Sequence, residues 1–447
     1  MRGRTRQTTR GIRLAGWFAA VSAVALLLVV VIWGRRLEAR EPRIKIGAAP
    51  FVGQWDWRPS VGLLPAIVVG MVLVAVVPPR LRRWRFQVSA WAAGVGLSAF
   101  AFLLAASDGL SAVLAPVVHP TEYWVNLSTL PPAGEMVRSF SSYDFLVDRS
   151  VHLKGHPPGF ILILKALASV GLGRPWVAGA LSFLGAAFVV PAVALTVRAL
   201  AGEAVARRTL PFLSCAPFVL WLGTSADAFY TAVCAWGIAA LAFALTSDHR
   251  SRRIVLGFVS GLLLGGGLFL SYGVATLLSL PLVIALSFVR RQFKVVLEVG
   301  ASATFGAALV TLGFARAGFW WFDGLSLTRE FYWVGSAYFR TWTYFMFANV
   351  VVLMIAVGPA VSVGVWRLRN RVTWVLVGGA LLGIAVAEVS QYSKGEVERI
   401  WLLAMPWLVP AASSLSSPIE GRDRTRLWLA GQVTIAVVLQ AWLRSKW

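Results

Sequence analysis

The sequence predicts an all-α polytopic membrane protein of about 13 transmembrane helices, and two observations lead to that prediction. Hydrophobic residues make up 58% of the 447 residues and charged residues only 14%, which leaves too little polar surface to cover a soluble domain. Apolar runs recur along the whole chain, and many approach the roughly 20 residues that a helix needs to cross a bilayer. The bilayer is therefore the expected solvent of this chain.

The apolar runs give the expected spans in chain order. They cover residues 14–33, 61–78, 87–106, 176–199, 209–224, 228–246, 253–271, 273–289, 294–315, 342–365, 372–389, 401–416 and 427–443. The run 157–172 is also about one span long, but counting it as a crossing would invert every later loop. We therefore expect an interfacial or re-entrant helix there. Its opening Pro157 and Pro158 suit a first helical turn, and Lys165 suits an interface better than the bilayer centre.

The distribution of charge predicts the orientation. The net charge is +23, yet the basic residues lie in small clusters between apolar runs rather than on one face, which argues against a nucleic-acid partner. Five arginines precede the first span, so the N-terminus is expected in the cytoplasm of a multi-pass plasma-membrane protein. The other short basic loops then fall on the same side, at 80–85, 198–208, 250–253, 290–294, 367–371 and 422–426.

One segment disagrees with this orientation. Residues 34–60 should lie outside, yet they contain six basic residues, which we can attribute only to contact with anionic lipid headgroups. These residues are Arg35, Arg36, Arg40, Arg43, Lys45 and Arg58.

The outer loops hold nearly all the residues that could carry chemistry. Asp108 directly follows the third expected span, where a carboxylate can either end a helix together with Gly109 or act as a general base. The long loop 107–175 comes next and contains three of the four histidines, from which we predict no zinc site. Glu122 and His152 are secondary candidates in this loop.

Three further strings combine charge with an apolar boundary. In KGHPPGF, Lys154 and His156 could donate to a phosphate beside a helix start, or the prolines could simply stiffen a turn. In TSADAFY, Asp227 could be a helix N-cap, a functional acid, or both. In YSKGEVERIWL, charges border an apolar run, where they are costly unless paired or used. The candidates from this last string are Glu396, Glu398 and Arg399; Tyr272, in LFLSYGVAT, could be an interface tyrosine or a ligand contact.

In their order along residues 87–416, these motifs resemble the GT-C superfamily of membrane glycosyltransferases. That class includes protein O-mannosyltransferases and the actinobacterial arabinosyl and mannosyl transferases. The matching features are an acid after an early span (Asp108), a long outer loop ending in His156-Pro157-Pro158, and an outward acid in TSADAFY (Asp227). GHPPGF and GEVERIW are also similar to strings of actinobacterial membrane proteins of this type. Many relatives have a second acid after the first, where this chain has Gly109.

The resemblance implies a GT-C fold over residues 87–447, preceded by an anchor of two extra helices in residues 1–86. It implies an enzyme that takes a sugar from a polyprenyl-phosphate carrier, with inversion. The acceptor would be a hydroxyl of a cell-envelope glycan, lipid or protein on the extracytoplasmic face. Asp108 would be the catalytic base. The substrate and phosphate ligands would be Lys154, His156, Asp227, Tyr272, Glu398 and Arg399. A divalent metal is compatible with the family, although no ligand set for one is predicted.

Two other functional classes remain open. Many helices and Gly-rich segments such as GLLLGGG (261–267) also suit a transporter or lipid-linked sugar flippase, but polar residues in transporters gather near the midplane of repeated halves. A catalytically inactive protein of GT-C type, or a non-catalytic assembly protein, is the second alternative.

Overall fold

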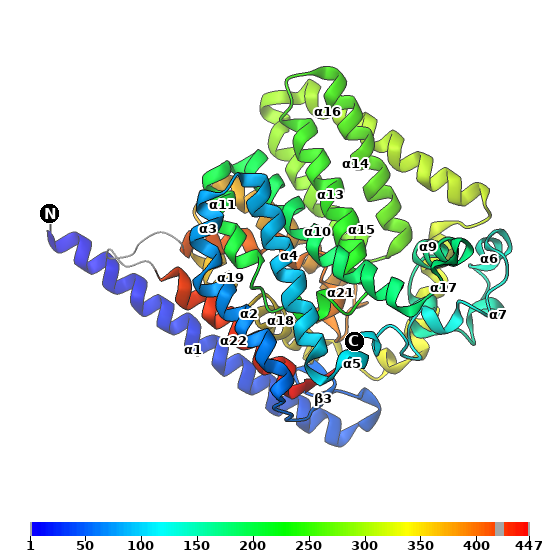
Figure 1. The fold of residues 1–447 in the computed structure, drawn as a ribbon, viewed down its shortest axis with the longest axis horizontal. Coiled ribbons are helices and arrows are strands. Elements are labelled where there is room, and N and C mark those ends of the chain that lie inside the picture. Colours follow the sequence, from blue (N-terminus) through cyan, green and yellow to red (C-terminus); the bar gives the residue numbers. More distant parts are fainter. Residues whose placement is uncertain (1, 416–423, 446–447) are drawn as a thin grey trace.

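Most of the expected spans are helices in the computed structural model (Figure 1). It describes residues 2–415 and 424–445, and the side chains of residues 21–415 and 424–445. Six helical segments of the described residues are long and apolar enough to cross a membrane. They are α4 with the turn η3 (Phe86–Asp108), α10 (Pro175–Ala201), α13 (Asp227–Leu245), α14 (Arg250–Leu270), α15 with α16 (Val274–Arg316) and α20 (Arg371–Val389).

Two further spans are bent. Val61–Ala75, which contains α2 (Leu64–Ala75), meets α3 (Val77–Arg83) at 45°, next to Pro78 and Pro79. Helices α18 (Trp342–Val357) and α19 (Pro359–Arg367) meet at 101° around Gly358, whose φ of 81° favours glycine. The first and last expected spans lie in α1 (Arg2–Arg40) and α22 (Thr425–Trp442).

The expected spans 273–289 and 294–315 form a helical hairpin. Its second half runs parallel to α14, because Gly257, Gly261 and Gly265 approach Val299, Ala303 and Ala307 in the same order. The chain therefore reverses direction at Gln292, where the helical backbone is broken. The basic turn expected between these two spans lies at this reversal.

Two of the expected spans are not continuous helices within the described residues. Residues 209–224 divide between α11 (Glu203–Leu213) and α12 (Val219–Leu222), and residues 401–415 form turns and the 3-10 segments η7 (Met405–Trp407) and η8 (Val409–Leu415). Prolines interrupt both runs, at Pro217 and Pro410. These runs are apolar because they are buried inside the helical bundle: η8 packs against α11 and α19. Residue 416, the end of the second run, and Arg422 of the last basic loop lie outside the described residues.

The long loop contains short helices instead of a domain of its own. These are α5 (Leu110–Leu114), η4 (Trp124–Asn126), α6 (Ala133–Ser139), α7 (Tyr143–Leu146) and α8 (Val151–Gly155). The expected interfacial helix follows as α9 (Gly159–Leu167) and η5 (Ala168–Leu172), too short to cross a bilayer. The aromatic segment after α16 forms α17 (Trp321–Val334) and η6 (Ser336–Tyr338), and α21 (Val397–Ile400) carries the GEVERIW string.

The segment 34–60 packs into the same end of the molecule. It contains η1 (Pro42–Ile44) and a pair of short antiparallel strands, β1 (Gly47–Ala48) and β2 (Phe51–Val52). The 3-10 turn η2 (Val61–Leu63) follows it directly. Strand β3 (Gln54–Trp55) pairs with β4 (Leu443–Arg444), which directly follows α22. Segments from both ends of the sequence therefore pair at one end of the molecule, where Figure 1 labels β3 and α5.

Candidate active site

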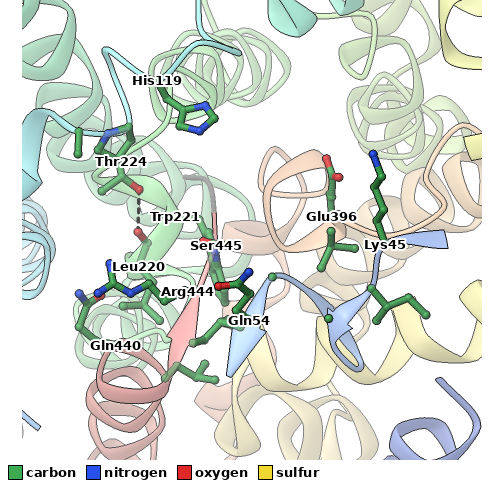
Figure 2. Close-up of a pocket in the computed structure, with 18 of the residues that line it drawn as sticks. Lys45, Gln54, His119, Leu220, Trp221, Thr224, Glu396, Gln440, Arg444 and Ser445 are labelled. Atoms are coloured by element: carbon green, nitrogen blue, oxygen red, sulfur yellow. Dashed lines mark hydrogen bonds between the residues drawn. The ribbon is translucent and has the colours of Figure 1, made fainter. Parts of the chain in front are cut away.

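A cavity of about 750 Å³ opens at this end of the helical bundle (Figure 2). The ends of α4 and α22 contribute apolar side chains, whereas the loops and the short strands contribute charged ones. Four cations line it, Lys45, Arg58, Arg340 and Arg444, together with three acids, Glu38, Asp108 and Glu396. Figure 2 shows Lys45 and Glu396 on one wall, facing Arg444, Gln440 and Thr224 on the other. A mixed apolar and cationic lining of this kind suits an amphipathic anion.

Asp108 lies in the wall of this cavity at the end of η3. Gly109 follows with a φ of 107°, a conformation that favours glycine, and it turns the chain from η3 into α5. The carboxylate accepts a hydrogen bond of 3.1 Å from Nη1 of Arg58, and about a third of the Asp108 side chain is exposed. Asp108 is therefore an accessible carboxylate with one cationic partner.

Behind the cavity wall lies a buried cluster of four side chains, Glu122, His152, Asp227 and Arg399. Arg399 on α21 reaches two other elements: its Nε lies 2.9 Å from Oδ2 of Asp227, the first residue of α13, and its Nη1 contacts Nε2 of His152 on α8. Nδ1 of His152 lies 2.7 Å from Oε1 of Glu122. The cluster thus joins α8, α13 and α21 to the loop before η4.

The partners of His152 fix its tautomer. A guanidinium can only donate, so Nε2 of His152 must accept from Arg399, and the ring proton lies on Nδ1, from which it is donated to Glu122. His152 therefore has no lone pair left to act as a base. Asp227 is equally committed, because it accepts from Arg399 and from Oγ of Ser225 at 2.6 Å.

Burial shifts the pKa values of the loop residues in this cluster. It raises the pKa of Glu122 to about 7, although the charge of Arg399 opposes the shift. It lowers the pKa of His152 well below the usual range, with Arg399 adding to the effect, and lowers that of His156 to about 4. Both histidines are therefore neutral at pH 7, whereas Glu122 titrates near neutrality.

Thr224 connects the two regions. A small hollow of about 20 Å³, enough for roughly one water molecule, is lined by Glu122, Tyr123 and Thr224. Thr224 also lines the large cavity. The cluster therefore lies directly behind one wall of the cavity and supports it from the inside.

The other predicted site residues lie in three places. His156 borders the cluster, with Nδ1 3.1 Å from the carbonyl oxygen of His152 and its ring beside Tyr123. Glu398 is fully buried next to Arg399 on α21. Lys154 and Tyr272 lie against α17: the ammonium of Lys154 donates to the carbonyl oxygen of Val147 at 3.0 Å, and the ring of Tyr272 packs edge-on against Trp321.

The structure thus brings together Glu122, His152, Asp227 and Arg399, with His156 beside them, and it places Asp108 and Glu396 in the adjoining cavity. Sequence reasoning missed the cations that line that cavity, Lys45, Arg58, Arg340 and Arg444. A signal for two of these cations was present. Lys45 and Arg58 belong to the basic residues of segment 34–60 that the expected orientation left unexplained.

The described residues supply no ligand set for the divalent metal that the family resemblance allows. Among the described residues, no group of three or more His, Cys, Asp or Glu side chains could hold a metal ion. The charged partner of Asp108 is a guanidinium, and Glu122 lies between a neutral histidine and a guanidinium. A cation placed beside either carboxylate would meet like charge.

Comparisons with known proteins gave two structural similarities. No protein-family model matches the chain, and no curated protein matches it either. Two structures of oligosaccharyltransferase from Archaeoglobus fulgidus are similar to it. One, in complex with Zn and sulfate, has a TM-score of 0.43 and 11% identity, over 65% of this chain and 45% of that one. The other, with an inhibitory peptide and a dolichol-phosphate, has a TM-score of 0.41 and 10% identity, over 82% and 57%. The chain thus spans about half the length of these structures.

Proposed function

We propose that this protein is a glycosyltransferase that moves a sugar from a polyprenyl-phosphate carrier to a hydroxyl acceptor in the cavity around Asp108. One observation carries the proposal. An accessible carboxylate shares a cavity with four cations at the ends of membrane-spanning helices. A lipid-linked sugar phosphate needs this combination: a base for the acceptor, positive charge for the leaving phosphate, and a position near the membrane surface for a lipid chain.

The reaction needs one proton acceptor and one stabilised leaving group. Asp108 would take the proton from the acceptor hydroxyl as its oxygen attacks the anomeric carbon. The new glycosidic bond would form as the bond from that carbon to the phosphate oxygen breaks, and polyprenyl phosphate would leave with the electron pair. Attack from the face opposite the phosphate would invert the anomeric centre. Phosphate is already a good leaving group, so the main task of the cations is to stabilise its developing charge.

In this arrangement the phosphate does not contact two of the residues that the resemblance suggests as its ligands, Arg399 and Lys154. Arg399 is committed to Asp227 and His152, and Lys154 points at α17, so neither is placed to contact a phosphate in the cavity. In our proposal the buried cluster holds the cavity wall in position, and the cations in the cavity bind the ligand. The order of the GT-C-like motifs supports the same reaction class, and the outward orientation predicted from the basic loops would put it on the extracytoplasmic face.

The first test is transfer of a radiolabelled sugar from polyprenyl phosphate by the purified protein, comparing wild type with Asp108→Asn. We expect the variant to lose roughly 100- to 10,000-fold in rate, the range for removing a general base. Its thermal unfolding should match that of the wild type, because Asp108 is partly exposed.

Several sugar donors should be tried. If none supports transfer by the wild-type protein, the enzyme proposal fails, and transport of lipid-linked sugar across liposomes becomes the next assay. Full activity of Asp108→Asn would leave the glycosyltransferase proposal intact but would show that Asp108 is not the catalytic base.

A further inference from the structure

The wall of the cavity beside Asp108 is built by an antiparallel pairing between segments from the two ends of the sequence. Gln54 pairs with Arg444 and Trp55 with Leu443. The pairing continues beyond the strands, because the backbone N–H groups of Asp56 and Arg58 donate to the carbonyl oxygens of Trp442 and Ala441, each at 2.8 Å. This ladder places Arg58 and Arg444 in one rigid wall of the cavity.

Close backbone contacts hold this wall against the turn that carries Asp108. Gly62 approaches Ser107 so closely that a Cβ at this glycine would lie 2.1 Å from the carbonyl oxygen of Ser107. Ser60 donates to the same carbonyl oxygen at 3.2 Å. Gly53 approaches the backbone of Arg444 in a similar way. The positions of Arg58 and Arg444 relative to Asp108 therefore depend on backbone packing and not on side-chain charges alone.

The two guanidiniums share one acid. Oδ2 of Asp56 lies 2.8 Å from Nε of Arg58 and 3.2 Å from Nε of Arg444. Arg58 also pairs with Asp108 through Nη1. Within the described residues no other ion pair uses these guanidiniums, so most of the N–H groups directed away from Asp56 remain for a ligand.

A phosphate oxyanion has the geometry and charge to use those N–H groups, since two guanidinium forks can each offer paired donors. We propose that Arg58 and Arg444 clamp the phosphate of the lipid carrier and that Arg58 exchanges Asp108 for this phosphate when the carrier binds. This inference rests on the proposed function and names the residues that bind its donor. The exchange would free the Asp108 carboxylate to accept a proton at the moment the donor is in place.

The proposal predicts opposite effects for the two partners of the Arg58–Asp108 pair. Arg58→Gln and Arg444→Gln should each weaken the binding of radiolabelled long-chain polyprenyl phosphate by about 10- to 100-fold, the value of a charge-assisted hydrogen bond. Asp108→Asn should tighten it by about two- to fivefold, because it removes a partly exposed competitor for Arg58. Binding is measured by scintillation proximity on the full-length protein in phosphatidylcholine nanodiscs.

The probes separate the phosphate from its carrier. Polyprenol without phosphate should bind all variants equally. Inorganic phosphate should compete weakly, because it lacks the lipid chain, and an affinity equal to that of the lipid would overturn the assignment to a lipid headgroup. Arg43→Gln is the matched control: Arg43 lies in the same segment, but it is exposed and paired with Glu41 at 2.6 Å, and it does not line the cavity. This variant should bind like wild type.

Two results would overturn the clamp. Wild-type affinity in both arginine variants would show that neither guanidinium contacts the phosphate. Weaker binding by Asp108→Asn, similar to that of Arg58→Gln, would show that Arg58 acts only by holding the Asp108 turn. If Arg58→Gln fails to fold, Arg444→Gln decides alone, because Arg444 does not contact Asp108.

The clamp and the enzyme proposal fail separately. If the protein transfers sugar but the arginine variants bind polyprenyl phosphate like wild type, the clamp is wrong and the glycosyltransferase proposal stands. If binding of polyprenyl phosphate depends on the two arginines but no donor supports sugar transfer, the clamp stands and the glycosyltransferase proposal is wrong.

Discussion

The cavity around Asp108 and the cluster around Arg399 contain the same types of charged side chain in different surroundings. In the cavity, the side chains of Arg58 and Asp108 are 25% and 31% exposed, whereas Arg399 and Asp227 in the cluster are each 9% exposed. A partly exposed pair can exchange partners at little cost, because water and ligands replace what is lost. A buried pair cannot, because separating it leaves an unpaired charge away from water. This difference supports our proposal that the cavity performs the chemistry and that the cluster fixes its shape.

The largest expected effect comes from breaking the cluster. Arg399→Met leaves the carboxylate of Asp227 buried without its cation and removes the donor to His152. We expect a loss of about 3–5 kcal/mol in the free energy of unfolding, the range for removing one partner of a buried pair. Thermal unfolding of the purified protein in detergent measures it.

The control for this experiment is Asp108→Asn, which should change stability by no more than about 0.5 kcal/mol. Equal melting temperatures for Arg399→Met and wild type would contradict the structural role of the cluster. The proposed division between a cavity for chemistry and a cluster for structure would then be wrong.

A smaller effect is expected in the pH dependence of stability, where Glu122 should behave differently from the neighbouring histidines. Burial raises the pKa of Glu122 from its usual 4.5 to about 7, so the folded protein keeps a proton that the unfolded chain releases between these values. The contribution of this group to stability therefore falls as the pH rises through 7. Between about pH 6 and about pH 8, wild type should lose about 1 kcal/mol relative to Glu122→Gln.

The free energy of unfolding is measured for wild type and for Glu122→Gln at each pH, and the difference between the two proteins is compared. The pKa values of His152 and His156 are lowered by burial, so their contributions are lost as the pH falls below their usual pKa of 6.5. That loss lies below pH 6.5, so the change in stability above this pH reports Glu122 rather than the histidines. Parallel pH profiles for wild type and Glu122→Gln would show that Glu122 stays ionised in the folded protein.

The smallest expected effect lies outside both regions. Lys154→Gln should change sugar transfer by less than about twofold, since the ammonium faces the carbonyl oxygen of Val147 and the ring of Phe331 on α17. Rates are measured with the assay used for Asp108→Asn. A loss of transfer comparable to that of Asp108→Asn would support the sequence-based assignment of Lys154 to the phosphate and place the donor near α17 instead of in the cavity.

Several site features could be predicted from the sequence because they depend on local patterns. Apolar length and basic turns identified the helical hairpin of residues 273–315, and Pro157 and Pro158 marked the start of a short helix that does not cross. Charges at apolar boundaries identified Asp227 and Arg399, since such charges need partners. The pairing of Asp227 with Arg399 was not predictable, because 171 residues separate them and only the packing of α13 against its neighbours brings α21 into reach.

The sequence by itself determined that this is a helical membrane protein, because so many apolar runs with so few charges leave too little polar surface for a soluble fold. It also identified which charged residues would be costly without partners. The tertiary structure decided which apolar runs are continuous helices and which are broken segments buried inside the bundle, because hydropathy is the same for a residue facing lipid and one facing another helix. It also decided that segment 34–60 and the strand after α22 build the cavity wall that carries Arg58 and Arg444. That wall depends on backbone hydrogen bonds across nearly the whole chain, and these leave no pattern in the sequence.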